Sequence, residues 1–112
     1  MKIEEYDFGF IRVNGKTYEN DIVITPEGIT EWWRKEGHMV YPEDIDNILD
    51  DKPDMVIFGT GKSGRMNVTG EVKKMLENKN ILIKIANTDV AKDIYNKSNE
   101  KMRVYALLHL TC

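Results

Sequence analysis

The sequence predicts a single α/β domain with a mixed β-sheet flanked by helices, in which an N-terminal antiparallel hairpin precedes a β-α-β-α-β second half. Two observations carry this prediction. Asn14-Gly15, the preferred dipeptide of a two-residue hairpin turn, separates two strand-like segments. From residue 55 onward, short apolar runs alternate with segments of helical periodicity. Because 112 residues is a common length for one domain, we expect a single domain over residues 1–112.

The first third of the chain is expected to consist of strands. Residues 8–13 and 17–24 flank the hairpin turn, and the Pro-Glu-Gly sequence at 26–28 predicts a second turn. Residues 29–40 are expected to form a further strand, although their polar and apolar side chains alternate poorly.

A short helix is expected after this strand. Pro42 and the two acidic residues behind it open the helix, because acidic side chains suit a first turn. Three apolar side chains then follow at the i, i+3, i+4 spacing of one helix face, namely Ile45, Ile48 and Leu49. Pro53 ends the helix.

The second half is expected to alternate strands with helices. Its strands are predicted at residues 55–58, 81–86 and 104–108, and the first is a continuous apolar run typical of a strand covered on both faces. Thr69 is expected to cap the first helix and Thr88 the second. The apolar helix faces consist of Val72, Met75 and Leu76 in the first helix and of Val90, Ala91, Ile94 and Tyr95 in the second. The connections are short enough for right-handed crossovers.

Parallel pairing of these strands would bring three loops together. The carboxyl ends of parallel strands lie at one edge of a sheet, so residues 59–64, 87–89 and 109–112 are expected to be neighbours. Ligand sites in open α/β sheets form at such edges.

The first of these loops carries a weak nucleotide motif. Gly59, Gly61 and Gly64 match G-x-G-x-x-G directly after a predicted strand. In a dinucleotide site the helix begins within the glycines, whereas here residues 65–68 separate them from the next helix, so the helix dipole is displaced from the loop. A P-loop is excluded, because Val56 stands where that motif needs its first glycine.

Two interpretations of the glycine loop stay open. The glycines either let the chain reverse at a crowded sheet edge, or expose successive N–H groups as a nest for a small anion. Lys62 and Arg65 would favour an anion, but they are also ordinary solvated loop residues. The candidate ligand-binding residues are Gly59, Thr60, Gly61, Lys62, Ser63, Gly64, Thr88 and His109.

Other side chains also have a functional and a structural interpretation. His109 and Cys112 could act as base and thiol, or His109 could be a satisfied histidine at a strand end and Cys112 a mobile terminal residue. His38 lies either on the surface or at the same sheet edge. Trp32 and Trp33 form either a binding patch or a pair with one member buried and the other half-exposed.

The composition excludes several classes of function. With 41% apolar and 31% charged residues, the chain is typical of a soluble globule. A net charge of −3 argues against nucleic acid as a partner, because binding to phosphate backbones needs a clustered basic surface. No apolar run approaches the roughly 20 residues of a membrane-spanning helix, and the N-terminus lacks a signal-peptide layout, so no membrane association is expected.

The cysteine count indicates a reducing compartment. Cys112 is the only cysteine and the last residue, so an intrachain disulfide is excluded and a cytoplasmic location is expected. Since only two histidines accompany it, we predict no metal site and no other cofactor.

Several short segments, spread over nearly the whole chain, form a recognisable set. They are Tyr6-Asp7-Phe8-Gly9, Asp21-Ile22-Val23-Ile24, Trp32-Trp33, residues 58–64, Tyr95-Asn96 and the ending Ala106-Leu107-Leu108-His109-Leu110-Thr111-Cys112. Together they resemble the small Mth-type domain family, which includes the adipogenesis-associated Mth-domain protein of animals, the mitochondrial NADH dehydrogenase (complex I) assembly factor three and many short prokaryotic members. The loop Gly-Thr-Gly-x-Ser-Gly and the ending are the most specific parts of the resemblance.

The resemblance implies a mixed α/β fold, an intracellular location and no established catalytic activity. It carries over no catalytic residues. The mitochondrial members imply assembly through protein contacts, but this sequence shows no transit peptide, so a role in complex I assembly is not expected of it.

Two functions are therefore expected. The first is a cytosolic, non-enzymatic interaction or assembly-type domain with a protein partner, because no acid/base pair, metal set or activated nucleophile can be assembled from the sequence. The alternative is binding of a small anion or a nucleotide-derived ligand at the glycine loop, which leaves room for an unrecognised enzymatic activity. A homodimer is a further expectation, since the N-terminal hairpin supplies an exposed edge strand.

Overall fold

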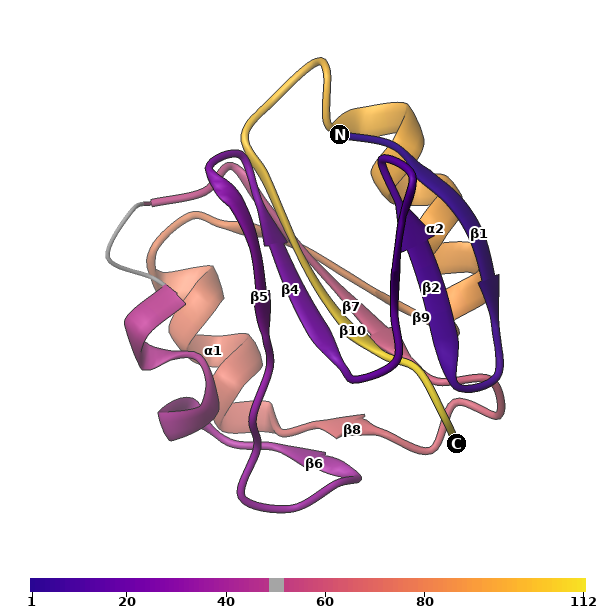
Figure 1. The fold of residues 1–112 in the computed structure, drawn as a ribbon. Coiled ribbons are helices and arrows are strands. Elements are labelled where there is room, and N and C mark those ends of the chain that lie inside the picture. The colour runs from indigo at the N-terminus through magenta and orange to yellow at the C-terminus, as the bar shows by residue number, and fades with distance from the viewer. Residues whose placement is uncertain (49–51) are drawn as a thin grey trace.

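The structure, a computed structural model, describes residues 1–48 and 52–112 and contains a five-stranded sheet, a three-stranded sheet and a two-stranded ribbon (Figure 1). The five-stranded sheet has the order β5-β4-β10-β7-β9 and consists of β4 (Ile22–Thr25), β5 (Gly28–Glu31), β7 (Met55–Thr60), β9 (Leu82–Ala86) and β10 (Val104–His109). The three-stranded sheet consists of β1 (Ile3–Asp7), β2 (Phe10–Val13) and β3 (Lys16–Tyr18), and the ribbon of β6 (Met39–Val40) and β8 (Asn67–Val68). The helices are α1 (Gly70–Asn78) and α2 (Thr88–Ser98), with two 3-10 turns, η1 (Pro42–Asp44) and η2 (Asp46–Ile48).

Strand β10 is the middle of the five-stranded sheet and joins the two halves of the chain. It pairs antiparallel with β4, where Leu107 lies opposite Val23, and parallel with β7, where Leu107 lies opposite Phe58. Strand β7 pairs in parallel with β9 on its other side. The predicted α/β fold with a mixed sheet and a β-α-β-α-β second half is therefore confirmed, and the three parallel strands end at one edge.

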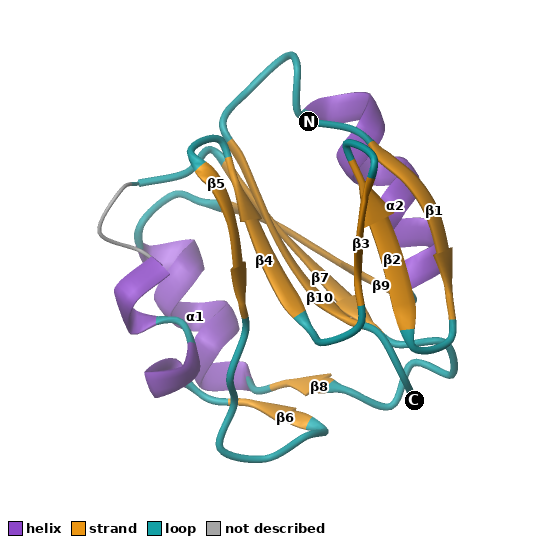
Figure 2. Cartoon of the chain, viewed as in Figure 1, coloured by secondary structure: helices purple, strands orange, loops and turns teal. Residues whose placement is uncertain are grey.

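Each face of this sheet has its own core, because side chains alternate along the strands. Ala106 and Leu108 of β10 pack in one core, and Tyr105 and Leu107 pack in the other. The first core lies between the sheet and the layer of α2 with the three-stranded sheet, and the second lies against α1, the 3-10 turns and the ribbon (Figure 2). Strand β7 is buried along its whole length, as expected for a strand covered on both faces.

The N-terminal hairpin is confirmed at its turn but not in its second strand. Asn14 and Gly15 have φ values of 48° and 81°, the left-handed conformation that this turn requires. The strand predicted at 17–24 is divided, because the exposed polar residues 19 and 20 carry the chain from the three-stranded to the five-stranded sheet. Strand β1, which pairs with β2, was not among the predicted strands.

The strand predicted at residues 29–40 is wrong for its central part. Strand β5 ends at Glu31, and the chain returns to extended pairing only in the ribbon. The side chains after Glu31 bond to partners outside β5. The Trp32 indole Nε1–H donates to the Asp44 carbonyl at 3.1 Å, and the Arg34 guanidinium donates to the Asp21 carboxylate. Trp32 is 7% exposed and Trp33 82% exposed, which confirms that one of the pair meets the core.

The short helix predicted after Pro42 is also corrected. Two 3-10 turns replace it, because the Asp44 carboxylate accepts the Tyr41 N–H at 2.8 Å and the Ile45 N–H donates to the Pro42 carbonyl, three residues back. The predicted position Leu49 lies outside the described residues.

The two predicted helix caps have different outcomes. Thr69 is the N-cap of α1, where its hydroxyl accepts the Val72 N–H at 3.4 Å. Thr88 does not cap α2, because Asn87 occupies the cap position and Thr88 is the first residue of the helix. The Thr88 hydroxyl is bonded elsewhere, at the sheet edge.

Candidate functional site

The three loops predicted to share one sheet edge lie together, and the hydroxyl of one residue is bonded to the other two loops. The Gly61 N–H donates to Thr88 Oγ1 at 2.9 Å, and Thr88 Oγ1 donates to the His109 carbonyl at 2.6 Å. A Cβ added at Gly59 would lie 2.9 Å from the same oxygen, so the close approach of α2 to β7 requires glycine there. Thr88 thus ties the ends of β7 and β10 to the first turn of α2.

The glycine loop is bonded to residues 111 and 112 of the same chain. The Lys62 N–H donates to the Thr111 carbonyl at 2.7 Å, and the Arg65 N–H donates to the Cys112 carbonyl at 2.9 Å. Gly61 has a φ of +100°, and a Cβ there would lie 2.3 Å from the Cys112 carbonyl carbon. Two of the amides that the predicted nest would use, those of Gly61 and Lys62, are therefore donated to groups of the protein, as is the amide of the neighbouring Arg65.

The Lys62 side chain is also engaged. Its Nζ lies 3.3 Å from carboxylate oxygens of both Asp7 and Asp89, and 5.3 Å from the centre of the Tyr6 ring. The hydrogen bond to Asp7, which has the largest effect, and the hydrogen bond to Asp89 raise the pKa of Lys62. The positive charge of Lys62 is therefore paired with two carboxylates.

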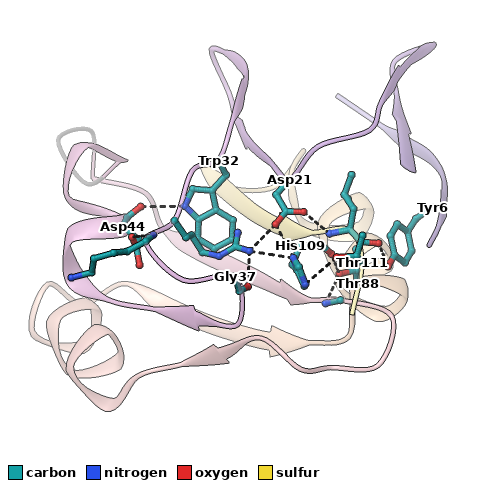
Figure 3. Close-up of polar contacts among 12 residues, drawn as sticks. Tyr6, Asp21, Trp32, Gly37, Asp44, Thr88, His109 and Thr111 are labelled. Carbon is teal, nitrogen blue, oxygen red and sulfur yellow. Dashed lines mark hydrogen bonds and ion pairs between the residues drawn. The ribbon is translucent and has the colours of Figure 1, made fainter. Parts of the chain in front are cut away.

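A second cluster of polar side chains lies at the same edge, around Asp21 (Figure 3). The Leu110 N–H donates to Asp21 Oδ1 at 2.8 Å, while His109 Nδ1 and Arg34 Nη2 each lie 2.7 Å from Oδ2. Burial acts to raise the pKa of Asp21, but the hydrogen bonds from His109, Leu110 and Arg34 outweigh it and lower this pKa. Because the ionised carboxylate can only accept, His109 Nδ1 carries the proton in this bond.

The Asp21–His109 pair has a chemical capability that its surroundings limit. A carboxylate on Nδ1 orients an imidazole so that Nε2 can act as a general base. Here His109 is 5% exposed, and its Nε2 lies 3.5 Å from the Thr111 hydroxyl. The pair therefore anchors residues 109–111. This arrangement agrees with the structural interpretation of His109, a histidine at a strand end whose hydrogen bonds are satisfied.

Arg34 is held in a small cage of its own. Its guanidinium carbon lies 4.3 Å from the centre of the Trp32 ring, and Nη2 donates to both the Asp21 carboxylate and the Gly37 carbonyl, the latter at 2.8 Å. Its side chain is 4% exposed. The Nε and Nη1 atoms are buried and have no hydrogen-bond partner among the described residues.

A hollow of about 460 Å³ opens beside this cluster. Asp21, Arg34 and His109 line it together with Glu31 and Trp33. A second hollow, of about 360 Å³, is also lined by Glu31 and Trp33. Trp33 is thus an exposed ring that borders two concave regions.

The other candidate side chains are placed as follows. Ser63 and Gly64 are exposed in the loop. His38 is exposed as well, yet its ring centre lies 5.8 Å from that of His109, so it belongs to the same edge. Cys112 is a partly buried free thiol whose backbone carbonyl is bonded to the loop.

Sequence reasoning missed Asp21 and Arg34. The available signal was positional: Asp21 directly precedes an apolar strand, and Arg34 follows two tryptophans. Within residues 1–48 and 52–112, no group of three or more His, Cys, Asp or Glu side chains is arranged to hold a metal ion. None of the helices in this part of the chain has the length and apolar character needed to span a bilayer.

Comparison with solved structures defines the class of the fold. The conserved hypothetical protein PH1505 from Pyrococcus horikoshii OT3 is 31% identical, with a TM-score of 0.93 over 100% of both chains. A protein described as MT938 is 26% identical, with a TM-score of 0.83 over 99% of this chain and 98% of its own. A protein from Bordetella pertussis, described as a Mth938-like domain, shares the fold at 20% identity, with a TM-score of 0.76 over 97% of this chain and 85% of its own.

The chain is therefore a Mth938-like α/β domain. The family described as protein of unknown function (DUF498/DUF598) matches residues 3–109, and the chain belongs to it. The resemblance to the Mth-type domain family is confirmed by these findings.

Proposed function

We propose that this chain is a cytosolic, non-enzymatic interaction domain that contacts a protein partner through the surface formed by Glu19, Glu31 and Trp33, which we name the Trp33 surface. The observation that carries the proposal is the 82% exposure of Trp33. Tryptophan is enriched among the residues that contribute most to binding at protein interfaces. Trp33 also lines two hollows, which offer a partner concave regions beside the ring.

The segment that carries Trp33 is fixed on both sides, which supports this role. Trp32 is buried and bonded to the Asp44 carbonyl, and Arg34 is bonded to Asp21. The backbone at Trp33 is therefore ordered before a partner arrives. A preorganised contact loses less conformational entropy on binding than a flexible one.

The non-enzymatic part of the proposal rests on the state of the polar side chains at the sheet edge. His109 is buried against Asp21 and Thr111, and Lys62 is bonded to two carboxylates. The alternative, an anion or nucleotide-derived ligand at residues 59–64, has less support, because the Gly61 and Lys62 amides already donate to Thr88 and Thr111. The cytosolic part rests on the single cysteine, which suits a reducing compartment.

The proposal is tested by affinity purification with the wild-type chain and with Trp33→Ala. A partner captured by the wild type is identified, purified and titrated against both proteins by calorimetry. We expect Trp33→Ala to weaken binding by about tenfold or more, as for the loss of a central aromatic contact. Because Trp33 is exposed, the variant should unfold at the wild-type temperature.

Phe8→Ala is the matched control, since Phe8 is an exposed aromatic residue at the turn between β1 and β2. This variant should bind as the wild type does. Equal affinity of Trp33→Ala and wild type for every captured partner would show that the interaction surface lies elsewhere.

A further inference from the structure

We propose that the partner segment at the Trp33 surface is basic, and that one of its Arg or Lys side chains lies between the Trp33 ring and the Glu31 carboxylate. This inference rests on the proposed interaction function and names the chemistry of the partner. It follows from an arrangement that the chain already contains once, with its own arginine as the occupant.

The occupied arrangement is the cage around Arg34. An indole ring, that of Trp32, lies under the guanidinium at 4.3 Å, and a carboxylate, that of Asp21, accepts from it at 2.7 Å. Attraction to the ring face and a charge-assisted hydrogen bond together hold a cation in place. Both groups border the 460 Å³ hollow.

An indole and a carboxylate occur again among the residues that line the hollow, and no cationic side chain of the described residues lies between them. Trp33 follows Trp32 in the chain and is exposed, and no cation lies over its ring among the described residues. Glu31 and Glu19 are exposed carboxylates that form no ion pair within the described part of the chain. All three line the hollow beside the Arg34 cage.

The charges around the hollow favour a cation. Asp21 and Arg34 form an ion pair at 2.7 Å, so the negative charges of Glu19 and Glu31 are left uncompensated. Lys35 does not fill this role, because its Nζ is bonded to Glu43 at 2.7 Å. The Nε and Nη1 atoms of Arg34, which have no hydrogen-bond partner in the described part of the chain, do not recruit an anion, since they are buried.

A protein segment suits the site better than a free small amine. Trp33 and Glu31 line both the 460 Å³ and the 360 Å³ hollow, so the two concave regions adjoin at these residues and offer room for more than one side chain. A peptide can place an arginine at Trp33 and further residues along these regions. Arginine is preferred over lysine, because its planar guanidinium stacks on an indole and donates to a carboxylate at the same time.

The test is a titration of the ¹⁵N-labelled protein, followed by its amide and indole resonances. The probe is an end-blocked Gly-Arg-Gly-Arg-Gly peptide, compared with the same peptide carrying neutral citrulline and with free spermidine. We expect the arginine peptide to shift the Trp33 indole and the amides of residues 31–37. The citrulline peptide should bind at least about threefold more weakly, since an exposed ion pair and an exposed cation–π contact each contribute a few-fold in affinity.

Variants assign the contact to its two partners. Glu31→Gln and Trp33→Ala should each lower the affinity for the arginine peptide by about three- to fivefold. Glu77→Gln, an exposed carboxylate on α1, is the matched control and should leave binding unchanged. The inference is overturned by equal binding of the arginine and citrulline peptides, by no binding of either, or by spermidine binding as tightly as the arginine peptide.

The partner found by affinity purification separates this inference from the function on which it rests. If Trp33→Ala loses that partner while Glu31→Gln and raised salt have no effect, the interaction function stands and the basic segment is wrong. If Trp33→Ala binds the partner as tightly as the wild type does, the partner is bound elsewhere and the Trp33 surface itself is wrong.

Discussion

The carboxylate of Asp21 and the imidazole of His109 lie 88 residues apart in the chain and meet at 2.7 Å, one position beyond the last backbone pair of their strands. Strands β4 and β10 pair as far as Ile22 opposite Leu108. Asp21 and His109 are the next residues in that register, and their side chains continue the contact where the backbone ladder stops. The Leu110 N–H, bonded to the same carboxylate, extends it further.

Asp21→Asn should destabilise the protein at neutral pH and reduce its sensitivity to acid. The pKa of Asp21 is lower in the folded than in the unfolded chain, so its contribution to stability is present above the unfolded pKa of about 3.9 and is lost as the pH falls through the folded pKa. We expect a loss of about 2 kcal/mol at pH 7 from the weakened charged hydrogen bonds. Urea unfolding between neutral and strongly acidic pH measures both effects, and a variant as stable as the wild type at pH 7 would contradict the prediction.

Thr88→Val should destabilise the domain because it removes both bonds of the joining hydroxyl. The Gly61 N–H and the His109 carbonyl would lose a partner at a fully buried position. We expect a cost of about 2–3 kcal/mol, the penalty for buried polar groups left unbonded. Thr88→Ser keeps the hydroxyl and should recover most of the lost free energy of unfolding, measured with a denaturant. If the serine variant is as unstable as the valine variant, the effect comes from packing and not from the hydrogen bonds.

Gly61→Ala should release residues 111 and 112 from the glycine loop. The new Cβ would clash with the Cys112 carbonyl carbon, and a φ of +100° is unfavourable for alanine. We expect destabilisation of about 2 kcal/mol or more and faster hydrogen exchange at the Lys62 and Arg65 amides. Gly70→Ala, at a helical position where an added Cβ would contact no other part of the fold within 4 Å, should leave exchange at these amides unchanged.

Tyr6 should titrate late, because burial first, and then the charge of Asp89, raise its pKa to about 12. This raised pKa gives stability that is present below the unfolded pKa of about 10 and is lost as the pH rises through 12. A titration followed by near-ultraviolet absorbance should show one more phenol ionising in this range in the wild type than in Tyr6→Phe. The variant also loses the bond to the Leu110 carbonyl, which should cost about 1 kcal/mol.

Lys84→Val should promote self-association. Strand β9 is a sheet edge that exposes Leu82 and Ile85, and Lys84 is the only charged residue within it. A central lysine protects such an edge from pairing with another copy. Gel filtration with light scattering should give a larger mass for Lys84→Val than for the wild type. The helix-surface control Lys73→Val should have the wild-type mass. An unchanged mass of Lys84→Val would refute the protective role of Lys84, and the mass of the wild type itself tests the expected homodimer.

Features encoded by neighbouring residues could be predicted from the sequence. The Asn14-Gly15 turn, the buried strand after residue 54 and the Thr69 cap depend on local conformation or short-range periodicity, and all are confirmed. The meeting of the three loops followed from the topology of parallel strands.

Features that depend on distant side chains could not be predicted. The chain leaves the sheet after Glu31 because Trp32 and Arg34 find partners 12 and 13 residues away. Thr88 does not cap α2, because its hydroxyl is bonded to Gly61 and His109 at the ends of two strands. The sequence predicts that residues 109–112 lie beside the glycine loop, but it does not show that the Thr111 carbonyl accepts the Lys62 N–H or that the Thr88 hydroxyl accepts the Gly61 N–H.

The central position of β10 has a consequence for how the protein folds. Its neighbours β4 and β7 lie far upstream and have no contact with each other in the sheet except through it. The sheet therefore assembles only after long loops have closed, which places folding among the slower, non-local topologies. A chain shortened before residue 104 would lack the shared neighbour of both strands and should collapse without a continuous sheet.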